Sequence, residues 1–167
     1  MLATPEPRGL FSPGGARALA LLVPAALLGG ALFSQFVGGL YPCEMCIWQR
    51  WPHAVAIGFA LFAFIVPKAR TLFVILAALA IAASGAIGVF HAGVEQGWWE
   101  GITGCSTAVG GGTTNPDDLL AEIMAAPIVR CDQIPWSFMG LSLAAWNATI
   151  SLIGALLILI GVKKGSR

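Results

Sequence analysis

Residues 71–90 read TLFVILAALAIAASGAIGVF, twenty successive residues without a charged side chain. A helix of about 20 residues, rising ~1.5 Å per residue, crosses ~30 Å of hydrocarbon. Three more stretches of this length are mostly apolar, at about 18–37, 47–66 and 137–162. Because backbone groups find no water at that depth, each stretch is expected to be helical. The sequence therefore predicts an all-α fold, a bundle of four transmembrane helices.

The composition of the whole chain also indicates a membrane protein. Hydrophobic residues make up 57% of the 167 residues and charged residues 10%, whereas a soluble domain carries about a quarter charged residues. The length suits a single integral membrane domain over residues 1–167. The first apolar stretch is too long for a signal peptide and no A-x-A cleavage site follows it, so we interpret it as a span. A net charge of +1 argues against a nucleic acid partner, which needs a basic patch.

The basic residues predict the orientation in the membrane. Seven of the nine lie before the first span, between the second and third spans, or after the fourth: Arg8, Arg17, Lys68, Arg70, Lys163, Lys164 and Arg167. Four spans place these segments on one side, and the positive-inside rule makes that side, with both termini, cytoplasmic. The outer loops, about 38–46 and 91–136, then contain all four cysteines. In a bacterium they face the periplasm from the inner membrane, and disulfides persist there.

The long outer loop contains one predicted secondary structure element. Asn115 suits a helix N-cap, Pro116 suits the first helical position, and the two aspartates that follow oppose the positive end of the helix. Four apolar residues then share one face: Leu119, Leu120, Ile123 and Met124. The pattern predicts a short amphipathic helix, which lies either on the membrane surface or against the spans.

Cys43 and Cys46 form a C-x-x-C motif, which is typical of a redox-active dithiol, half of a zinc site or a structural disulfide. The second span has to begin near Ile47 to cross the membrane, so Cys46 is expected at the N-terminus of a helix, where a thiolate is favoured. Arg50 lies one turn deeper on the same face. It either stabilises negative charge on Cys46 and on a reduced acceptor, or extends to the headgroups. Pro52 is expected to loosen this part of the helix.

Cys105 and Cys131 lie 26 positions apart in the long loop. Their spacing favours a loop-closing disulfide, and the alternative is a four-thiolate zinc site shared with the first pair. We weigh against zinc because structural sites usually present two close pairs, so no metal ligand is assigned. His91, at the outer end of the third span, is either an interfacial histidine or a hydrogen-bond donor to a membrane-dissolved acceptor near Cys46.

Gln35, His53 and Asn147 are further polar residues within the spans. Gln35 and Asn147 are expected to hydrogen-bond across helices rather than to do chemistry. No role is predicted for His53.

The run CEMCIWQR, residues 43–50, resembles the signature of the disulfide bond formation protein B (DsbB) family. The stretch 131–146 is similar to the family's segment that enters its last helix, and the order of parts agrees along nearly the whole chain. The resemblance implies a thiol:quinone oxidoreductase of the bacterial inner membrane. Such a protein reoxidises a DsbA-like periplasmic thioredoxin-fold protein and passes the electrons to ubiquinone or menaquinone.

The resemblance also implies catalytic roles for the four cysteines. Cys105 matches the cysteine that forms a mixed disulfide with the partner, and Cys131 matches its companion. Cys43 matches the residue that exchanges with the long-loop pair. Cys46 matches the residue whose thiolate contacts the quinone.

Arg50 and His91 match the arginine and the histidine of the family's quinone site, so with Cys46 they are the predicted cofactor-binding residues. Two other functions stay open. One is a non-enzymatic metal-binding or sensing membrane protein that uses the four thiolates. The other is a structural four-helix protein whose disulfides only brace the outer loops. Within redox enzymes, a dedicated partner or the reductive direction also stays open.

Overall fold

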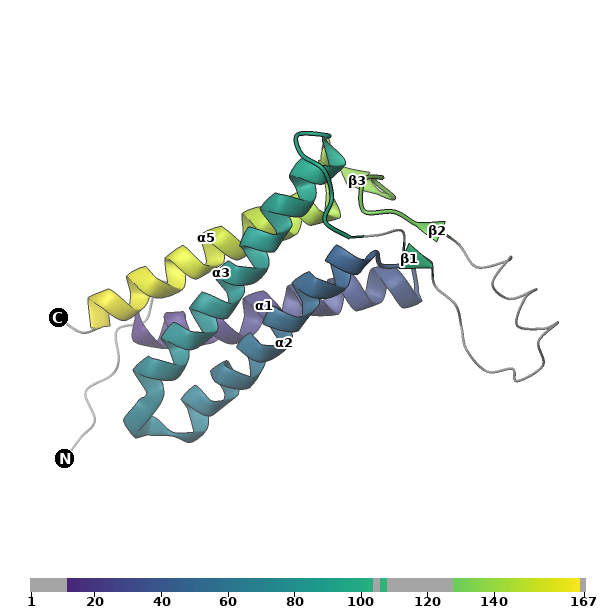
Figure 1. The fold of residues 1–167 in the computed structure, drawn as a ribbon. Coiled ribbons are helices and arrows are strands. Elements are labelled where there is room, and N and C mark those ends of the chain that lie inside the picture. Colours follow the sequence, from purple (N-terminus) through teal and green to yellow (C-terminus); the bar gives the residue numbers. More distant parts are fainter. Residues whose placement is uncertain (1–11, 104–105, 108–127, 166–167) are drawn as a thin grey trace, which may run out of the picture.

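The computed structural model describes residues 12–103, 106–107 and 128–165. Its four long helices are α1 (Pro13–Phe36), α2 (Glu44–Ile65), α3 (Arg70–Glu95) and α5 (Leu143–Gly165), and a short 3-10 helix, η1 (Pro67–Ala69), joins α2 to α3. The helices lie alongside one another (Figure 1). α3 packs against both α2 and α5, and α1 packs against the same two helices. The predicted mainly helical architecture is confirmed.

Three of these helices are long and apolar enough to cross a membrane: α1, α3 together with η1, and α5. α2 has 22 residues, which is the length of a span. It does not reach the hydropathy of the others because its first half carries Gln49, Arg50 and His53. It also continues through Pro52 without ending. Three of the four predicted spans are thus supported by length and composition, and the crossing of α2 belongs to the proposal below.

Small side chains fill the interior of the bundle, and large apolar ones cover its surface. The main buried cluster consists largely of alanines: Ala16, Ala20, Ala56, Ala60, Ala63, Ala77, Ala78 and Ala155. By contrast, Phe33 and Ile65 are 65% and 72% exposed. A Cβ at Gly88 would lie 3.1 Å from the carbonyl oxygen of Ala144, so α3 and α5 approach backbone to backbone. Small residues at helix contacts and apolar residues facing outward are typical of membrane proteins.

The two ends of the bundle carry different side chains. α1 begins and α5 ends at the same end, where η1 also lies (Figure 1), and a shallow pocket there is lined by residues of α1, α3 and α5. The basic residues of these elements and of η1 gather at this end: Arg17, Lys68, Arg70, Lys163 and Lys164. The connection from α1 to α2, with the C-x-x-C motif, lies at the other end. The basic residues and the first cysteine pair therefore occupy opposite ends.

α5 begins later than the sequence predicts. Residues 137–142 form an antiparallel hairpin instead of the first turns of a helix. Its strands are β3 (Ser137–Phe138) and β4 (Leu141–Ser142). Met139 and Gly140 take φ values of 52° and 79°, which a right-handed helix does not allow. The Ser142 hydroxyl then accepts a hydrogen bond from the N–H three residues on and caps α5. The predicted start at Ser137 is therefore wrong.

α3 ends later than predicted and so includes His91. The apolar run stops at Phe90, but the helix continues to Glu95. It ends where Gly97 takes a φ of 69° and the Trp98 N–H bonds to the Gly93 carbonyl, a common glycine cap. His91 is thereby fixed on a helix rather than in a loop.

A second short antiparallel pair joins two parts of the long loop, β1 (Ser106–Thr107) and β2 (Ile128–Val129). The predicted amphipathic helix after Asn115 lies outside the described residues, as does Cys105.

Candidate redox site and acceptor cavity

Helix α2 begins within the C-x-x-C motif. Cys43 is its N-cap, and the Cys43 Sγ accepts a hydrogen bond from the Cys46 N–H at 3.3 Å. The two Sγ atoms lie 2.9 Å apart, so a small movement brings them to the bond length of a disulfide, about 2.05 Å. The thiol of Cys43 donates to the sulfur of Cys46, and this bond together with burial raises the pKa of Cys43. When the reduced pair loses one proton, this geometry favours a thiol on Cys43 and a thiolate on Cys46.

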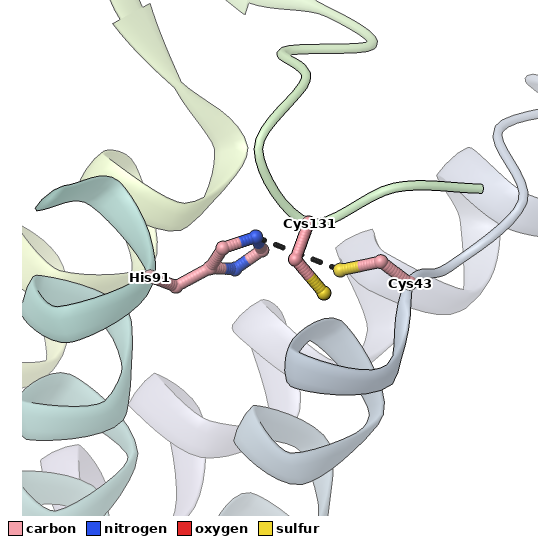
Figure 2. Close-up of side chains that lie close together, drawn as sticks. All are labelled: Cys43, His91 and Cys131. Atoms are coloured by element: carbon pink, nitrogen blue, oxygen red, sulfur yellow. Dashed lines mark hydrogen bonds between the residues drawn. The ribbon is translucent and has the colours of Figure 1, made fainter. Parts of the chain in front are cut away.

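A third cysteine reaches this motif from the long loop. Cys43, His91 and Cys131 are 3%, 2% and 7% exposed, and their ligand atoms lie within 4.8 Å of one another. Figure 2 shows the three side chains converging from the N-cap of α2, from α3 and from the segment before β3. The His91 Nε2 lies 3.5 Å from the Cys43 Sγ. Cys43 thus has one sulfur neighbour in its own motif, Cys46, and another from the long loop, Cys131. Thiol–disulfide exchange between two cysteine pairs requires such an arrangement.

A cavity of about 250 Å³ lies beside this cluster, with walls from α1, α2 and α5. Most of its lining is apolar, and the polar residues Gln49, Arg50, His53 and Asn147 line it together with Cys46. On α2 these residues follow Cys46 by three, four and seven positions, which is one face of a helix. A mostly apolar lining with a few convergent polar groups is typical of a small-molecule binding site.

Arg50 points towards α1 rather than away from the bundle. Its Nη1 donates to the Gln35 Oε1 at 2.5 Å, and its Nη2 donates to the Ala31 carbonyl at 3.2 Å. Its Nε–H is buried and has no hydrogen-bond partner among the described residues. The guanidinium is therefore held at the cavity wall, and its buried Nε–H is without an acceptor among the described residues. This geometry opposes the interpretation in which Arg50 extends to the headgroups.

Sequence reasoning missed a chain of hydrogen bonds that leads from the sulfur cluster into the bundle. Gln49 Nε2 lies 2.8 Å from the His91 Nδ1, and the Asn147 amide donates to the Gln49 Oε1 at 2.8 Å. Asn147 Oδ1 lies 2.8 Å from the His53 Nε2, and the Ser84 hydroxyl lies 2.9 Å from the same nitrogen. The expected cross-helix role of Asn147 is visible here. The spacing of 46, 49, 50 and 53 on one helical face was the available signal.

Glu95 is another residue that the sequence analysis did not single out. It lies one turn after His91, with its Oε1 3.8 Å from the His91 Nε2, and it accepts a hydrogen bond from the Ser142 hydroxyl. His91 itself is part of the sulfur cluster and is not among the residues that line the cavity. Its predicted contact with an acceptor stays a prediction.

Comparison with known proteins decides the family. The family model of Disulfide bond formation protein DsbB matches residues 15–161. The chain belongs to the DsbB family. It is 32% identical over 159 residues to Disulfide bond formation protein B of Polaromonas sp., covering 84% of this chain and 88% of the relative. A protein of the same name from Acidovorax sp. is 31% identical over 160 residues, covering 90% of this chain and 89% of the relative.

A more distant relative is an uncharacterized protein of Rickettsia prowazekii, 24% identical over 140 residues, covering 81% of this chain and 78% of that protein. No solved structure matches the chain significantly. The resemblance found in the sequence is thus confirmed, and this DsbB-family chain is a membrane protein of disulfide bond formation.

Proposed function

We propose that this DsbB-family protein is a thiol:quinone oxidoreductase that reoxidises a DsbA-like thioredoxin-fold protein of the periplasm. The observation that carries the proposal is the position of Cys46. It belongs to the C-x-x-C motif, and it also lines the cavity between α1, α2 and α5. A water-soluble thiol and a lipid-soluble acceptor can therefore use the same pair of sulfurs.

The proposed electron path runs through the four cysteines by thiol–disulfide exchange. A partner thiolate attacks Cys105 of a Cys105–Cys131 disulfide and releases the Cys131 thiolate. This thiolate attacks Cys43 of a Cys43–Cys46 disulfide and releases the Cys46 thiolate. The approach of Cys43 and Cys131 to within 4.8 Å supports this second step.

The remaining steps balance the reaction. The second partner thiol displaces Cys105 and closes the disulfide of the partner. The Cys105 thiolate then attacks Cys131, which restores the long-loop disulfide and releases the Cys43 thiolate. The electron pair left on the first cysteine pair passes from Cys46 to the quinone as the Cys43–Cys46 disulfide re-forms. Two protons from the partner dithiol end on the quinone oxygens. The net products are one partner disulfide and one quinol.

Ubiquinone or menaquinone is the proposed acceptor, and Arg50 is its proposed electrostatic partner. Arg50 lines the cavity, and its buried Nε–H has no hydrogen-bond acceptor among the described residues, so a small movement of the side chain would let it donate to an oxygen of the bound ring. A fixed cation beside Cys46 stabilises both a thiolate and negative charge that develops on the quinone.

The proposed placement is the bacterial inner membrane, with α2 as the fourth span. The basic end of the bundle faces the cytoplasm by the positive-inside rule. The cysteine end then faces the periplasm, where the proposed partner is found. Labelling of Cys43 and Cys46 from the cytoplasmic side, and not from the periplasmic side, would contradict this orientation.

Metal binding is the second candidate function, because Cys43, His91 and Cys131 offer three close ligand atoms. One experiment separates the two functions. Purified protein is mixed without oxygen with reduced DsbA-like partner and ubiquinone, and quinone absorbance is followed while zinc content is measured. Catalytic loss of quinone absorbance by metal-free protein supports the oxidoreductase. Stoichiometric zinc with no quinone reduction supports the metal-binding protein.

A further inference from the structure

Gln49 lies between the sulfur cluster and the polar residues inside the bundle, and it is only 6% exposed. Its amide nitrogen can only donate hydrogen bonds, and its amide oxygen can only accept them. The Nε2 lies 3.1 Å from the carbonyl oxygen of Met45, which can only accept. The Gln49 nitrogen therefore faces Met45, and the orientation of this amide is settled by the backbone.

The orientation of the Asn147 amide supports the same orientation of Gln49. Its Nδ2 lies 3.3 Å from the carbonyl oxygen of Ser84, so the donor end of this amide is also settled by a backbone acceptor. The same nitrogen lies 2.8 Å from the Gln49 Oε1, as an acceptor at that position of Gln49 requires. The backbone carbonyls of Met45 on α2 and Ser84 on α3 thus fix the same order of donors and acceptors: Asn147 donates to Gln49, and Gln49 donates to His91.

That direction decides where His91 carries its ring proton. The Gln49 Nε2 lies 2.8 Å from the His91 Nδ1, and since Gln49 donates there, Nδ1 has to accept. In a neutral imidazole the proton then sits on Nε2. A doubly protonated ring would place two donors face to face, so Gln49 also opposes a charged His91.

The proton on Nε2 points into the sulfur cluster. Nε2 lies 3.5 Å from the Cys43 Sγ and 3.8 Å from the Glu95 Oε1, and the ring also forms a hydrogen bond with the backbone of Cys131. All three partners accept hydrogen bonds. A donor at this place stabilises Cys43 whenever its sulfur leaves as a thiolate.

We propose that Gln49 is a positioning residue that fixes His91 as an Nε2–H donor to Cys43 and prevents it from acting as a metal ligand. A histidine bound to metal through Nε2 needs its proton on Nδ1, with a carboxylate or carbonyl to receive it. Gln49 presents a donor there instead. These hydrogen bonds hold His91 in the same way whichever molecule accepts electrons from Cys46.

Nuclear magnetic resonance tests the position of the proton directly. Full-length reduced protein labelled with nitrogen-15 is kept in detergent micelles, and the two ring nitrogens of His91 are assigned by comparison with His91→Gln. The expected spectrum shows a bare Nδ1 and a protonated Nε2. A protonated Nδ1 in the wild-type protein would overturn the proposal.

A substitution tests the exclusion of metal as a gain of function. Gln49→Glu replaces the donor facing Nδ1 by an acceptor, so His91 can turn its bare Nε2 to the two sulfurs. Because outer hydrogen-bond partners of metal ligands change affinity about 10- to 100-fold, reduced Gln49→Glu protein should bind Zn²⁺ tighter by about that factor. Adding His91→Ala should abolish the gain.

The matched control is Gln49→Met, which removes the same donor but offers the His91 Nδ1 no acceptor. Its zinc affinity should stay below that of Gln49→Glu. Equal zinc affinity of Gln49→Glu and the wild type would refute the role of Gln49. If Gln49→Glu fails to fold, the nitrogen-15 spectrum of the wild-type protein still decides.

Discussion

Arg50 connects α2 to α1 at the wall of the cavity, and its replacement tests the acceptor site. Two of its nitrogens are occupied by Gln35 and Ala31, whereas its Nε–H has no partner among the described residues. In the proposed complex this N–H and the positive charge act on an oxygen of the quinone. Arg50→Ala removes both.

The size of the effect follows from one charge-assisted hydrogen bond, which contributes about 1.5–3 kcal/mol. Since ~1.4 kcal/mol corresponds to a tenfold change, kcat/KM for quinone should fall about 10- to 150-fold, mainly through a higher KM. Arg50→Lys keeps the charge but loses the planar fork that serves Gln35 and Ala31 together. Its loss should be smaller than that of Arg50→Ala.

The assay varies ubiquinone at saturating reduced partner without oxygen and follows quinone absorbance. A second measurement controls for damage to the fold. Oxidation of the partner in a single turnover without added quinone uses only the disulfides, so both variants should retain it. Arg50→Ala with unaltered KM and kcat for quinone would refute the assignment of Arg50 to the acceptor site.

Three other perturbations test separate parts of the account. In Cys46→Ser the lone Cys43 thiol has no partner in its own motif, so its attack on Cys131 of the Cys105–Cys131 disulfide should form a Cys43–Cys131 disulfide and release the Cys105 thiol. Non-reducing mass spectrometry should find this disulfide, and its absence would speak against exchange between Cys43 and Cys131. Because the pKa of Cys43 is raised, its thiol should stay protonated above the pKa of an ordinary cysteine, about 8.5. At pH ~8, alkylation of reduced protein should therefore modify Cys46 before Cys43. Faster modification of Cys43 would contradict the assignment of the thiolate to Cys46. Gly88→Val should lower the free energy of unfolding by about 1–3 kcal/mol, because a Cβ there meets the backbone of α5 at 3.1 Å. Gly58→Val is the control, because a Cβ at that position meets nothing within 4 Å. Equal melting temperatures of the two variants would contradict the close approach of α3 and α5.

The sequence was sufficient for the helices because lipid imposes a simple rule. Any segment that crosses hydrocarbon needs about 20 apolar residues and internal hydrogen bonds, and both requirements are readable from residue type. The same rule placed Cys46 in the first turn of α2, where the structure has it. It failed at residues 137–142, because hydropathy does not register the left-handed turn at Met139 and Gly140 that breaks the helix.

The hydrogen-bonded chain could not be predicted in the same way. Gln49 and His91 lie 42 positions apart, and Gln49 and Asn147 lie 98 apart. Whether they meet depends on the rotation of α2, α3 and α5 about their axes. That rotation is set by small residues such as Gly88, and residue type alone does not fix it. Polar side chains in spans could be marked as partners for one another, but not paired.

The most direct test of the central claim isolates the first cysteine pair from the rest of the path. Protein with Cys105→Ser and Cys131→Ser is reduced, freed of reductant and mixed with ubiquinone in the absence of oxygen. The account expects each protein molecule to form one Cys43–Cys46 disulfide and one quinol. A dithiol that stays reduced while the quinone absorbance is unchanged would contradict it.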